Sequence, residues 1–464
     1  MCRRPPVPLL VLLALALTAC GAPVPGRAGP SSTIVGDAIR LSTSSLVDSG
    51  FVHGGDGGEI DKLAATAITD IQAYWTQAFP RTFGAPWQEL RGGFFSADTA
   101  DAGGQPPPCS KSTAAIAGNA YYCPSGDLIV WDRAALIPVL TERFGAGAVM
   151  LVLAHETGHA VQQRTGVTGG GERRRPDLYP GVVIESMADC YAGSFIRWVV
   201  DGHAEHLKLQ RGELDSALRA LITFRDPVGT PNTDNRAHGD AFDRVSAFQD
   251  GYDQGPELCS KITAENREFT QRAFGDAEDE ARGGNLPLPD LISAMSGDLA
   301  EHFTLELSNL GKQWTPPRIE AAVPDPLCTS GKQGAASYCP VANAVQTTGP
   351  VLPELHASIG DFGSGTELAT RYALGVLHAL ERPLAGEETR RQILCLAGAY
   401  TGSLLKPQRE FALSPGDLDE AVQALLAYDD PARDTEGGSI PSGFDRVSAF
   451  RTGVTGADPA CGLS

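Results

Sequence analysis

Apolar residues along this chain gather mainly in segments long enough to form helices. Three such segments predict helices, at residues 60–78, 141–165 and 181–200. In the first of them the apolar residues have the spacing of an amphipathic helix. Pro80 follows the first segment and is expected to end it. Residues 127–132, Asp-Leu-Ile-Val-Trp-Asp, form a short β-rich run after a proline and a glycine, which predicts a strand. We therefore expect a mainly α fold, of the α+β kind, with a small β-sheet.

The first apolar run of the chain is of a different kind. Residues 1–19 combine two arginines with an apolar run from Leu9 to Leu17, which predicts an export signal too short to span a membrane. The sequence Leu17-Thr-Ala-Cys20 resembles the bacterial lipobox, which implies that Cys20 becomes the lipidated first residue of the mature protein. Residues 20–45 then form a flexible linker. We expect an extracytoplasmic protein, anchored to the cell membrane as a lipoprotein through Cys20.

Length and charge narrow the possible functions. A chain of 464 residues is long enough for two or more domains, since one domain commonly has about 100 to 200 residues. The formal net charge is -19, and the longest block of basic residues is the three arginines at 173–175. Nucleic acids are therefore not expected as partners.

A repeat divides the chain into two parts. Residues 242–248, Phe-Asp-Arg-Val-Ser-Ala-Phe, recur unchanged at residues 444–450, and a cysteine follows each copy at nearly the same distance. A Tyr-Cys-Pro sequence also occurs once in each half. Repeats of this kind indicate that one structural unit occurs twice. We predict a tandem duplication, with one domain at residues 46–262 and a second copy at residues 263–464.

The cysteines fit the same division. Eight remain once Cys2 and Cys20 are set aside, and an even number in an exported protein predicts disulfides. Each predicted domain holds four of them in the same order, a close pair followed by two that are far apart. The simplest pairing that both domains can share is Cys109 with Cys123, Cys190 with Cys259, Cys328 with Cys339, and Cys395 with Cys461.

The second helical segment contains a motif that indicates metal chemistry. Residues 155–159 read His-Glu-Thr-Gly-His, so that on a helix the two histidines share one face, about 6 Å apart along the axis. His155 and His159 can then bind one Zn²⁺, and Glu156 lies beside the metal as a general base for an activated water. The motif indicates a zinc hydrolase, most simply a peptidase, with one zinc ion per chain.

A catalytic zinc ion generally has three protein ligands and one open position. The extended motif with a third histidine is absent, because Gln162 and Thr165 stand where glycine and histidine are required. The third helical segment carries Glu185 and Asp189 four residues apart, on one face. Carboxylates on an apolar helix need a positive partner, which zinc supplies. We expect Glu185 to be the third ligand and Asp189 to accept the free N–H of a zinc-bound histidine.

Several blocks of this sequence resemble one family, the bacterial neutral zinc metallopeptidases. The matching blocks are His-Glu-Thr-Gly-His-Ala-Val-Gln at 155–162, Glu-Ser-Met-Ala-Asp-Cys-Tyr-Ala-Gly at 185–193, Tyr-Cys-Pro at 122–124, and Ala-His-Gly at 237–239 followed by Arg244 and Gly251-Tyr252. The resemblance spans roughly residues 45–260. It implies a zincin-like helical domain in which His155, His159 and Glu185 hold zinc and Glu156 is the general base.

His238 has two interpretations. It precedes a predicted helix and could reach the site to donate a hydrogen bond to the oxyanion of a tetrahedral intermediate, which makes it a candidate catalytic residue. A structural role in a loop is an equal alternative. The second copy has Ile440-Pro-Ser-Gly in this region, which agrees with a catalytic role without proving it.

The second copy lacks the zinc motif. With Cys123 aligned to Cys339, 216 positions apart, the residues opposite His155, Glu156 and His159 are Arg371, Tyr372 and Gly375. Arginine is not a zinc ligand and glycine has no side chain, so residues 263–464 are expected to form a degenerate, non-catalytic domain.

Two functions from different classes follow. The first is a membrane-anchored, extracytoplasmic zinc endopeptidase that acts on peptide or protein substrates with Glu156 as general base. The alternative is a surface-exposed binding or scaffold lipoprotein in which the zinc is structural or vestigial. A third possibility concerns regulation, with residues 263–464 acting as a lid over the site.

Overall fold

The computed structural model describes residues 46–101, 103–323, 333–347, 349–406, 409 and 411–463. The predicted export signal, Cys20 and the linker to residue 45 lie outside the described residues. Helices make up 55% of the structure and strands 7%, which confirms a mainly helical fold with small sheets. Among the described residues, no helix combines the length and the apolar character that crossing a bilayer requires.

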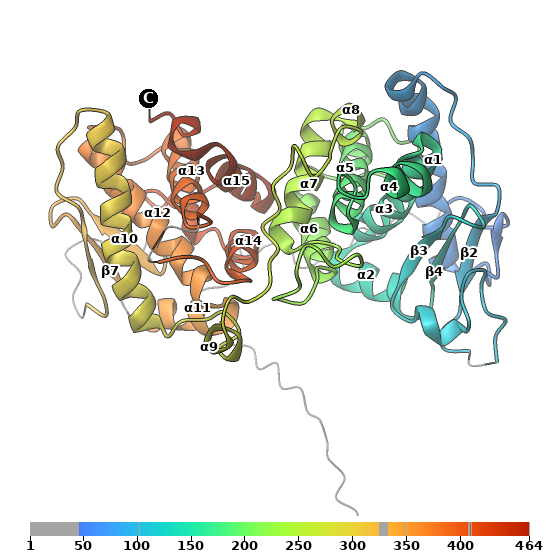
Figure 1. The fold of residues 1–464 in the computed structure, drawn as a ribbon, viewed down its shortest axis with the longest axis horizontal. Helices are drawn as coiled ribbons and strands as arrows, with labels where there is room; N and C mark the ends of the chain where they lie inside the picture. Colours follow the sequence, from blue (N-terminus) through green and yellow to red (C-terminus); the bar gives the residue numbers. More distant parts are fainter. Residues whose placement is uncertain are drawn as a thin grey trace, which may run out of the picture.

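The chain forms two lobes that lie side by side (Figure 1). The elements of the first lobe are β1 (Val52–His53), α1 (Glu59–Phe83), β2 (Gly93–Ala97), β3 (Ala120–Cys123), β4 (Leu128–Asp132), α2 (Leu136–Phe144), α3 (Ala146–Thr165), α4 (Glu172–Arg174), α5 (Gly181–Val200), α6 (Leu214–Thr223), α7 (Ala241–Gln254) and α8 (Pro256–Cys259). The elements of the second lobe are α9 (Ala277–Ala281), α10 (Leu288–Asn309), β5 (Arg318–Glu320), β6 (Ala336–Cys339), β7 (Ala344–Thr347), α11 (Val351–Ile359), α12 (Asp361–Ala379), α13 (Glu387–Ser403), α14 (Asp417–Ala427) and α15 (Gly443–Ala460).

Helix α1 is longer than its sequence predicts. Pro80 does not end it, because the helix continues to Phe83 and stops at Gly84, which has a φ of 71°. A proline inside a helix removes one backbone hydrogen bond. Here the last turn is held by aromatic packing, with ring centroids 4.6 Å apart for Phe79 and Phe83 and 5.3 Å apart for Phe79 and Trp87. Tertiary contacts therefore outweigh the local signal.

The predicted helix at residues 141–165 is two helices. Gly145, with a φ of 81°, ends α2 and begins α3, so the chain turns just before the helix that carries the zinc motif. A left-handed φ of this kind is readily adopted only by glycine. The predicted end of α3 is confirmed, because Gly166 follows Thr165 with a φ of 75°. The predicted helix at residues 181–200 coincides with α5.

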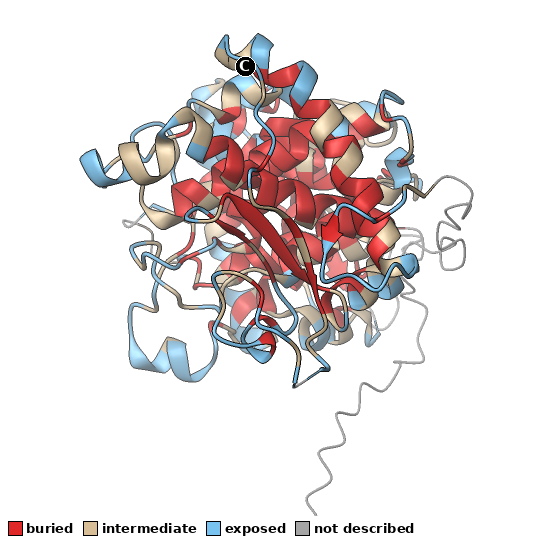
Figure 2. Cartoon of the chain, turned by 90° about the vertical axis from the view of Figure 1, so that its right-hand side faces the viewer, coloured by how far each residue is buried: buried red, intermediate tan, exposed pale blue. Residues whose placement is uncertain are grey.

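The first lobe has a four-stranded sheet in the order β1-β2-β4-β3. Strands β2 and β4 are parallel, and β3 pairs antiparallel with β4, so the strand expected at residues 127–132 lies inside the sheet. The edge strand beside α3 is therefore β3. Figure 2 shows the sheet and the helices behind it as one largely buried body, with exposed residues mainly in the surrounding loops.

Helices α5 and α7 cross at backbone contact. A Cβ atom added to Gly251 would lie 1.7 Å from the carbonyl oxygen of Cys190, and one added to Gly193 would lie 2.0 Å from that of Phe248. Only glycine fits at such a distance. A disulfide between Cys190 and Cys259 joins the same region. The crossing sets the position of α5 relative to α7, and both helices contribute residues to the site described below.

The second lobe has a three-stranded sheet, in the order β5-β7-β6. Strands β5 and β7 are parallel, and β6 pairs antiparallel with β7. Helices α13 and α15 also cross at backbone contact, because a Cβ atom added to Gly453 would lie 1.8 Å from the carbonyl oxygen of Cys395.

Three of the four expected cysteine pairs lie at disulfide distance in the structure: Cys109 with Cys123, Cys190 with Cys259, and Cys395 with Cys461. The fourth expected pair includes Cys328, which lies outside the described residues.

Three buried carboxyl groups meet in the second lobe. Ligand atoms of Asp361, Asp417 and Glu420 lie within 4.8 Å of one another. Burial and the neighbouring Asp361 raise the pKa of Glu420 to about 8, and burial raises the pKa of Asp361 to about 6. Near neutral pH the folded protein therefore keeps protons on this cluster that the unfolded chain has already released.

The close crossing gives a first prediction. Gly251→Ala should lower the free energy of unfolding by at least about 3 kcal/mol, because the added methyl group overlaps the backbone of α5. Gly297→Ala is the matched control, since Gly297 is exposed in α10 and an added Cβ there meets nothing within 4 Å. The control should be neutral or stabilise the helix by about 0.5 to 1 kcal/mol. Denaturant unfolding measures both, and equal stabilities would contradict the crossing.

The acidic cluster gives a prediction about pH. The unfolded pKa of Glu420 is about 4.3. Because its folded pKa is higher, its contribution to stability is present below that pH and is lost as pH rises through about 8. Glu420→Gln should therefore lose less stability than the wild type between pH 5 and pH 8, as measured by thermal unfolding. Glu387→Gln, at a 73% exposed side chain of α13, should follow the wild type.

Candidate metal centre

The three expected zinc ligands converge between α3 and α5. Glu185 Oε2 lies 3.2 Å from His155 Nε2, and Glu185 Oε1 lies 3.6 Å from His159 Nε2. The three groups offer ligand atoms that all lie within 4.8 Å of one another. The helices approach closely at Gly158, where an added Cβ would lie 2.9 Å from the Cα atom of Ala188. The glycine of the motif thus allows the histidines on α3 to face the carboxylate on α5.

The outward ring nitrogen of each histidine has a polar partner. His155 Nδ1 lies 2.6 Å from Asp189 Oδ1, and His159 Nδ1 lies 2.9 Å from Gln162 Oε1. Gln162 donates in turn to the carbonyl of Ile184, at 2.5 Å. An acceptor at each Nδ1 places the proton there and leaves Nε2 free to bind a metal. The ring orientations thus suit metal binding.

Arg244 on α7 completes this arrangement. Its guanidinium donates to both oxygens of Asp189, with Nε at 2.8 Å from Oδ2 and Nη2 at 2.9 Å from Oδ1. Its third nitrogen, Nη1, donates to the carbonyl of Phe224 at 2.7 Å. A bidentate pair of this kind fixes the orientation of a carboxylate as well as its charge. Asp189 is fully buried, so Arg244 keeps it ionised and aligned with His155.

The electrostatics favour positive charge at the centre. Burial alone would raise the pKa of Glu185, but His159 and His155 lower it to about 2. Burial alone would lower the pKa of His155, but Asp189 and Glu185 raise it to about 10. Buried Glu185 Oε2 also lacks a hydrogen-bond partner among the described residues, although His155 Nε2 is 3.2 Å away. Two imidazole nitrogens and a carboxylate form a donor set that fits zinc.

The expected general base lies beside these ligands. Glu156 is 8% exposed, and its Oε2 accepts a hydrogen bond of 2.7 Å from the backbone N–H of Tyr122, on the edge strand β3. Both residues line a cavity of about 370 Å³ together with the three candidate ligands. The carboxylate is therefore held at the wall of a space that is large enough for part of a peptide.

His238 lines the same cavity, and its side chain is 55% exposed. Its backbone N–H donates to Asp226 Oδ2 at 2.7 Å, and its Nδ1 lies 3.3 Å from Asp226 Oδ1. The hydrogen bond with Asp226 raises the pKa of His238 above its ordinary value. Asp226 therefore orients the imidazole, and a position at the cavity is compatible with either of its two interpretations.

Three partners could not be assigned from the sequence. The family blocks include Arg244 but no spacing rule connects it with Asp189, which is 55 residues away. Gln162 ends a family block and marks the absence of the longer zinc motif, but neither observation indicates its contact with His159. The amide of Tyr122 belongs to the backbone, so no residue type could indicate its bond to Glu156.

Two histidines on one helix and a glutamate on a later helix, beside a carboxylate at a cavity, are an arrangement typical of zinc hydrolases with a glutamate ligand. Residues 38–261 match the model of the family described as "Putative neutral zinc metallopeptidase". The resemblance predicted from the motifs is confirmed for this part of the chain.

Two of the relatives that the chain matches are described as uncharacterized. An uncharacterized protein of Mycobacterium tuberculosis is 30% identical over 162 residues, which cover 31% of this chain and 55% of the relative. The uncharacterized protein YpfJ of Escherichia coli is 28% identical over 158 residues, which cover 30% of this chain and 53% of YpfJ. The match thus spans about half the length of these relatives. No solved structure matches the chain.

The donor set gives a prediction about metal content. Purified protein should hold one zinc ion per chain, and Glu185→Gln should lower zinc affinity at least about 100-fold, because it removes the only anionic ligand. Elemental analysis and titration against a competing chelator measure both quantities. Glu172→Gln, at an exposed residue of α4, should bind zinc as the wild type does. Equal affinity in the two variants would exclude Glu185 as a ligand.

Proposed function

We propose that this chain is a zinc-dependent endopeptidase. His155, His159 and Glu185 hold the metal, and Glu156 is the general base. The observation that carries the proposal is the position of Glu156, which lies at a cavity wall beside a donor set suited to zinc. A zinc site with a purely structural role has no use for such a carboxylate.

The reaction assigned to the site is hydrolysis of a peptide bond. A zinc ion bound there supplies Lewis-acid polarisation of the scissile carbonyl and of water. Glu156 accepts the proton of the attacking water and passes it to the leaving amine. The amide of Tyr122 keeps one carboxylate oxygen in place during both transfers. His238, oriented by Asp226, donates a hydrogen bond to the oxyanion.

Strand β3 is the proposed binding edge for an extended substrate. It is the last strand of the sheet, and residues 119–122 line the cavity. An extended peptide can add to such an edge through main-chain hydrogen bonds, which select for backbone rather than for particular side chains. The substrate class is therefore peptides or proteins with an extended segment.

We also propose that the two lobes are copies of one domain, at residues 46–262 and 263–464. Strand β3 pairs with β4 from Cys123 opposite Leu128, and β6 pairs with β7 from Cys339 opposite Ala344, which is the same register 216 positions on. Asp127 and Asn343, also 216 positions apart, both have positive φ values and both accept a tyrosine hydroxyl. The glycine crossings of α5 with α7 and of α13 with α15 support the same conclusion.

The second lobe has other side chains where the first has its ligands. Arg371, opposite His155, is fully buried and donates to the backbone carbonyls of Arg433 and Asp430. Its Nε lies 3.4 Å from Glu367 Oε1. An arginine side chain thus stands in place of the first histidine ligand, which supports a non-catalytic role for this lobe.

The second lobe, called the silent lobe because it lacks the zinc motif, favours a second candidate function. A lobe preserved as a folded unit without zinc ligands is what a binding or scaffold protein requires. On this alternative the zinc of the first lobe is structural or vestigial, and Glu156 has no function.

Location rests on the sequence of the N-terminus. We propose that the lipobox ending at Cys20 anchors the protein to the membrane on its extracytoplasmic side, with residues 20–45 as linker. Disulfide pairing of Cys190 with Cys259 and of Cys395 with Cys461 suits an oxidising compartment.

The test of the enzyme is a pair of glutamate variants. Glu156→Gln should lower kcat on a casein or peptide library at least about 100-fold, because general-base catalysis contributes 10² to 10⁴. It should keep its zinc, which separates loss of the base from loss of the metal. Glu172→Gln serves as the control and should retain full activity. Equal turnover in both variants, or none from zinc-loaded wild type, would rule out the peptidase and favour the scaffold.

A further inference from the structure

The two lobes meet through helices α6 and α7 on one side and α14 and α15 on the other (Figure 1). At this contact each lobe caps a helix of the other lobe. Asp215, on α6, accepts hydrogen bonds from the backbone N–H groups of Gly443 at 2.6 Å and Phe444 at 2.8 Å. These are the first two residues of α15, so a first-lobe carboxylate satisfies donors that the helix itself leaves free.

The second lobe caps a helix of the first lobe in the same way. Asp419, on α14, accepts a hydrogen bond of 2.7 Å from the backbone N–H of Ala241, the first residue of α7. Its other oxygen lies 2.9 Å from Nε of Arg225, just after α6. Asp419 is 3% exposed, so its carboxyl group faces these protein groups and not water.

The two caps lie at matching positions of the two lobes. Asp215 is the second residue of α6 and Asp419 is the third residue of α14. Each stands in a Leu-Asp-x-Ala sequence, in which x is Ser in the first lobe and Glu in the second. Ala241 and Gly443 each begin the helix that carries the repeated Phe-Asp-Arg-Val-Ser-Ala-Phe sequence. A contact in which each side gives and receives the same interaction is the mark of a two-fold interface.

The two caps differ in what lies beyond them. Helix α7 carries Arg244 one turn after Ala241, and Arg244 holds Asp189, which holds His155. Helix α15 carries Arg446 at the same place, but that side chain donates to the carbonyls of Leu425, Ile440 and Pro441. The helix that Asp419 caps therefore carries an arginine in contact with the metal centre. The helix that Asp215 caps carries an arginine that contacts only backbone carbonyls among the described residues.

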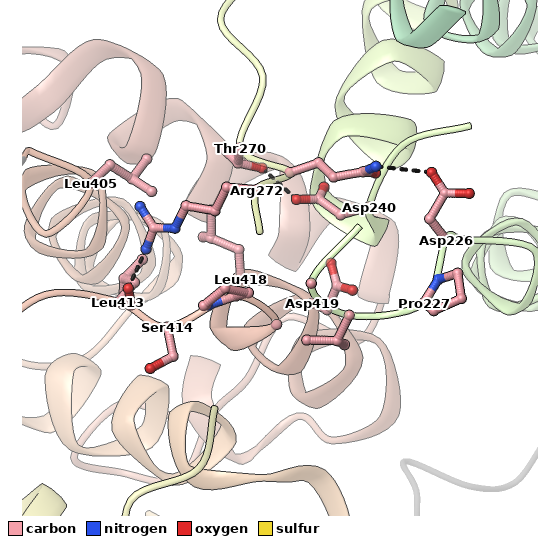
Figure 3. A pocket seen from close by; sticks show the side chains of 15 residues that line it. Asp226, Pro227, Asp240, Thr270, Arg272, Leu405, Leu413, Ser414, Leu418 and Asp419 are labelled. Atoms are coloured by element: carbon pink, nitrogen blue, oxygen red, sulfur yellow. Dashed lines mark hydrogen bonds between the residues drawn. The ribbon is translucent and has the colours of Figure 1, made fainter. Parts of the chain in front are cut away.

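The lobe boundary also lies next to the loop of His238. Figure 3 shows a small pocket where Asp226 and Asp240 of the first lobe meet Asp419 of the second. Residues 270–272, in the segment between α8 and α9, also line it. In that segment Gln271 Nε2 donates to Asp226 Oδ2 at 2.9 Å, and Asp226 is the partner of His238. The active-site loop and the start of α7 are thus both held at this boundary.

We propose that Asp419 of the silent lobe is a positioning residue of the metal centre. By capping α7 and binding Arg225, it holds Arg244 where the guanidinium aligns Asp189 with His155. The second lobe then acts as a permanent, tethered partner that keeps the first lobe competent for zinc. This inference rests on the proposed function, because it assigns a role relative to that zinc site.

The test compares Asp419→Ala with Asp215→Ala in the full chain. Each substitution removes one cap from the interface, so both should lower the midpoint of thermal unfolding by similar amounts. Asp419→Ala should in addition weaken zinc binding about tenfold, in competition with a chelator, and lower kcat/KM on the peptide library. Asp215→Ala should stay within about twofold of the wild type in zinc affinity. Asp419→Asn, which keeps an oxygen acceptor for Ala241, should recover most of the zinc affinity.

The outcomes separate the two proposals. Equal zinc affinities in Asp419→Ala and Asp215→Ala, whether both unchanged or both weakened, would overturn the positioning role while leaving the zinc site in place. A wild-type chain that binds no zinc would contradict the proposed function and this inference together. Selective weakening in Asp419→Ala with recovery in Asp419→Asn supports the proposal.

Discussion

Asp189 is a carboxylate without solvent exposure, and the first lobe is arranged around its charge. A buried anion is tolerated only when its oxygens are paired, and here His155 and Arg244 share them. His155 belongs to α3, Asp189 to α5 and Arg244 to α7, so one ionic group fixes three helices relative to one another. The glycine contacts Gly158 with Ala188 and Gly251 with Cys190 make the required approach possible. Packing and chemistry therefore depend on the same residue.

Local periodicity made much of this site predictable. His155, Glu156 and His159 lie within two turns of one helix, and Glu185 and Asp189 lie within one turn of another, so their relative positions follow from helix geometry. The paired arrangement of α3 and α5 also followed, since a zinc site needs a third ligand. The disulfides of the first lobe, Cys109 with Cys123 and Cys190 with Cys259, agree with the order in which the cysteines occur.

Features that depend on distant contacts were not predictable. Pro80 carries a strong local stop signal, but the packing of Phe83 and Trp87 against Phe79 keeps α1 helical beyond it. The break at Gly145 lies in an Ala- and Gly-rich stretch that reads equally well as one helix. Asp226 and Asp419 contact backbone amides, and an aspartate in sequence gives no sign of which amide it will meet.

The glycine crossings bear on which features persist in the second lobe under the proposed duplication. If the second lobe descends from a copy of the first, both histidine positions have changed, to Arg371 and Gly375, while Gly398 and Gly453 still bring α13 and α15 to backbone contact. Catalytic side chains can drift once selection on turnover ends, because each replacement needs only to be buried and paired. A backbone contact leaves no room for any side chain and tolerates no intermediate step. If the two lobes are copies of one domain, as proposed, steric necessity has preserved the record of that ancestry longer than chemistry has.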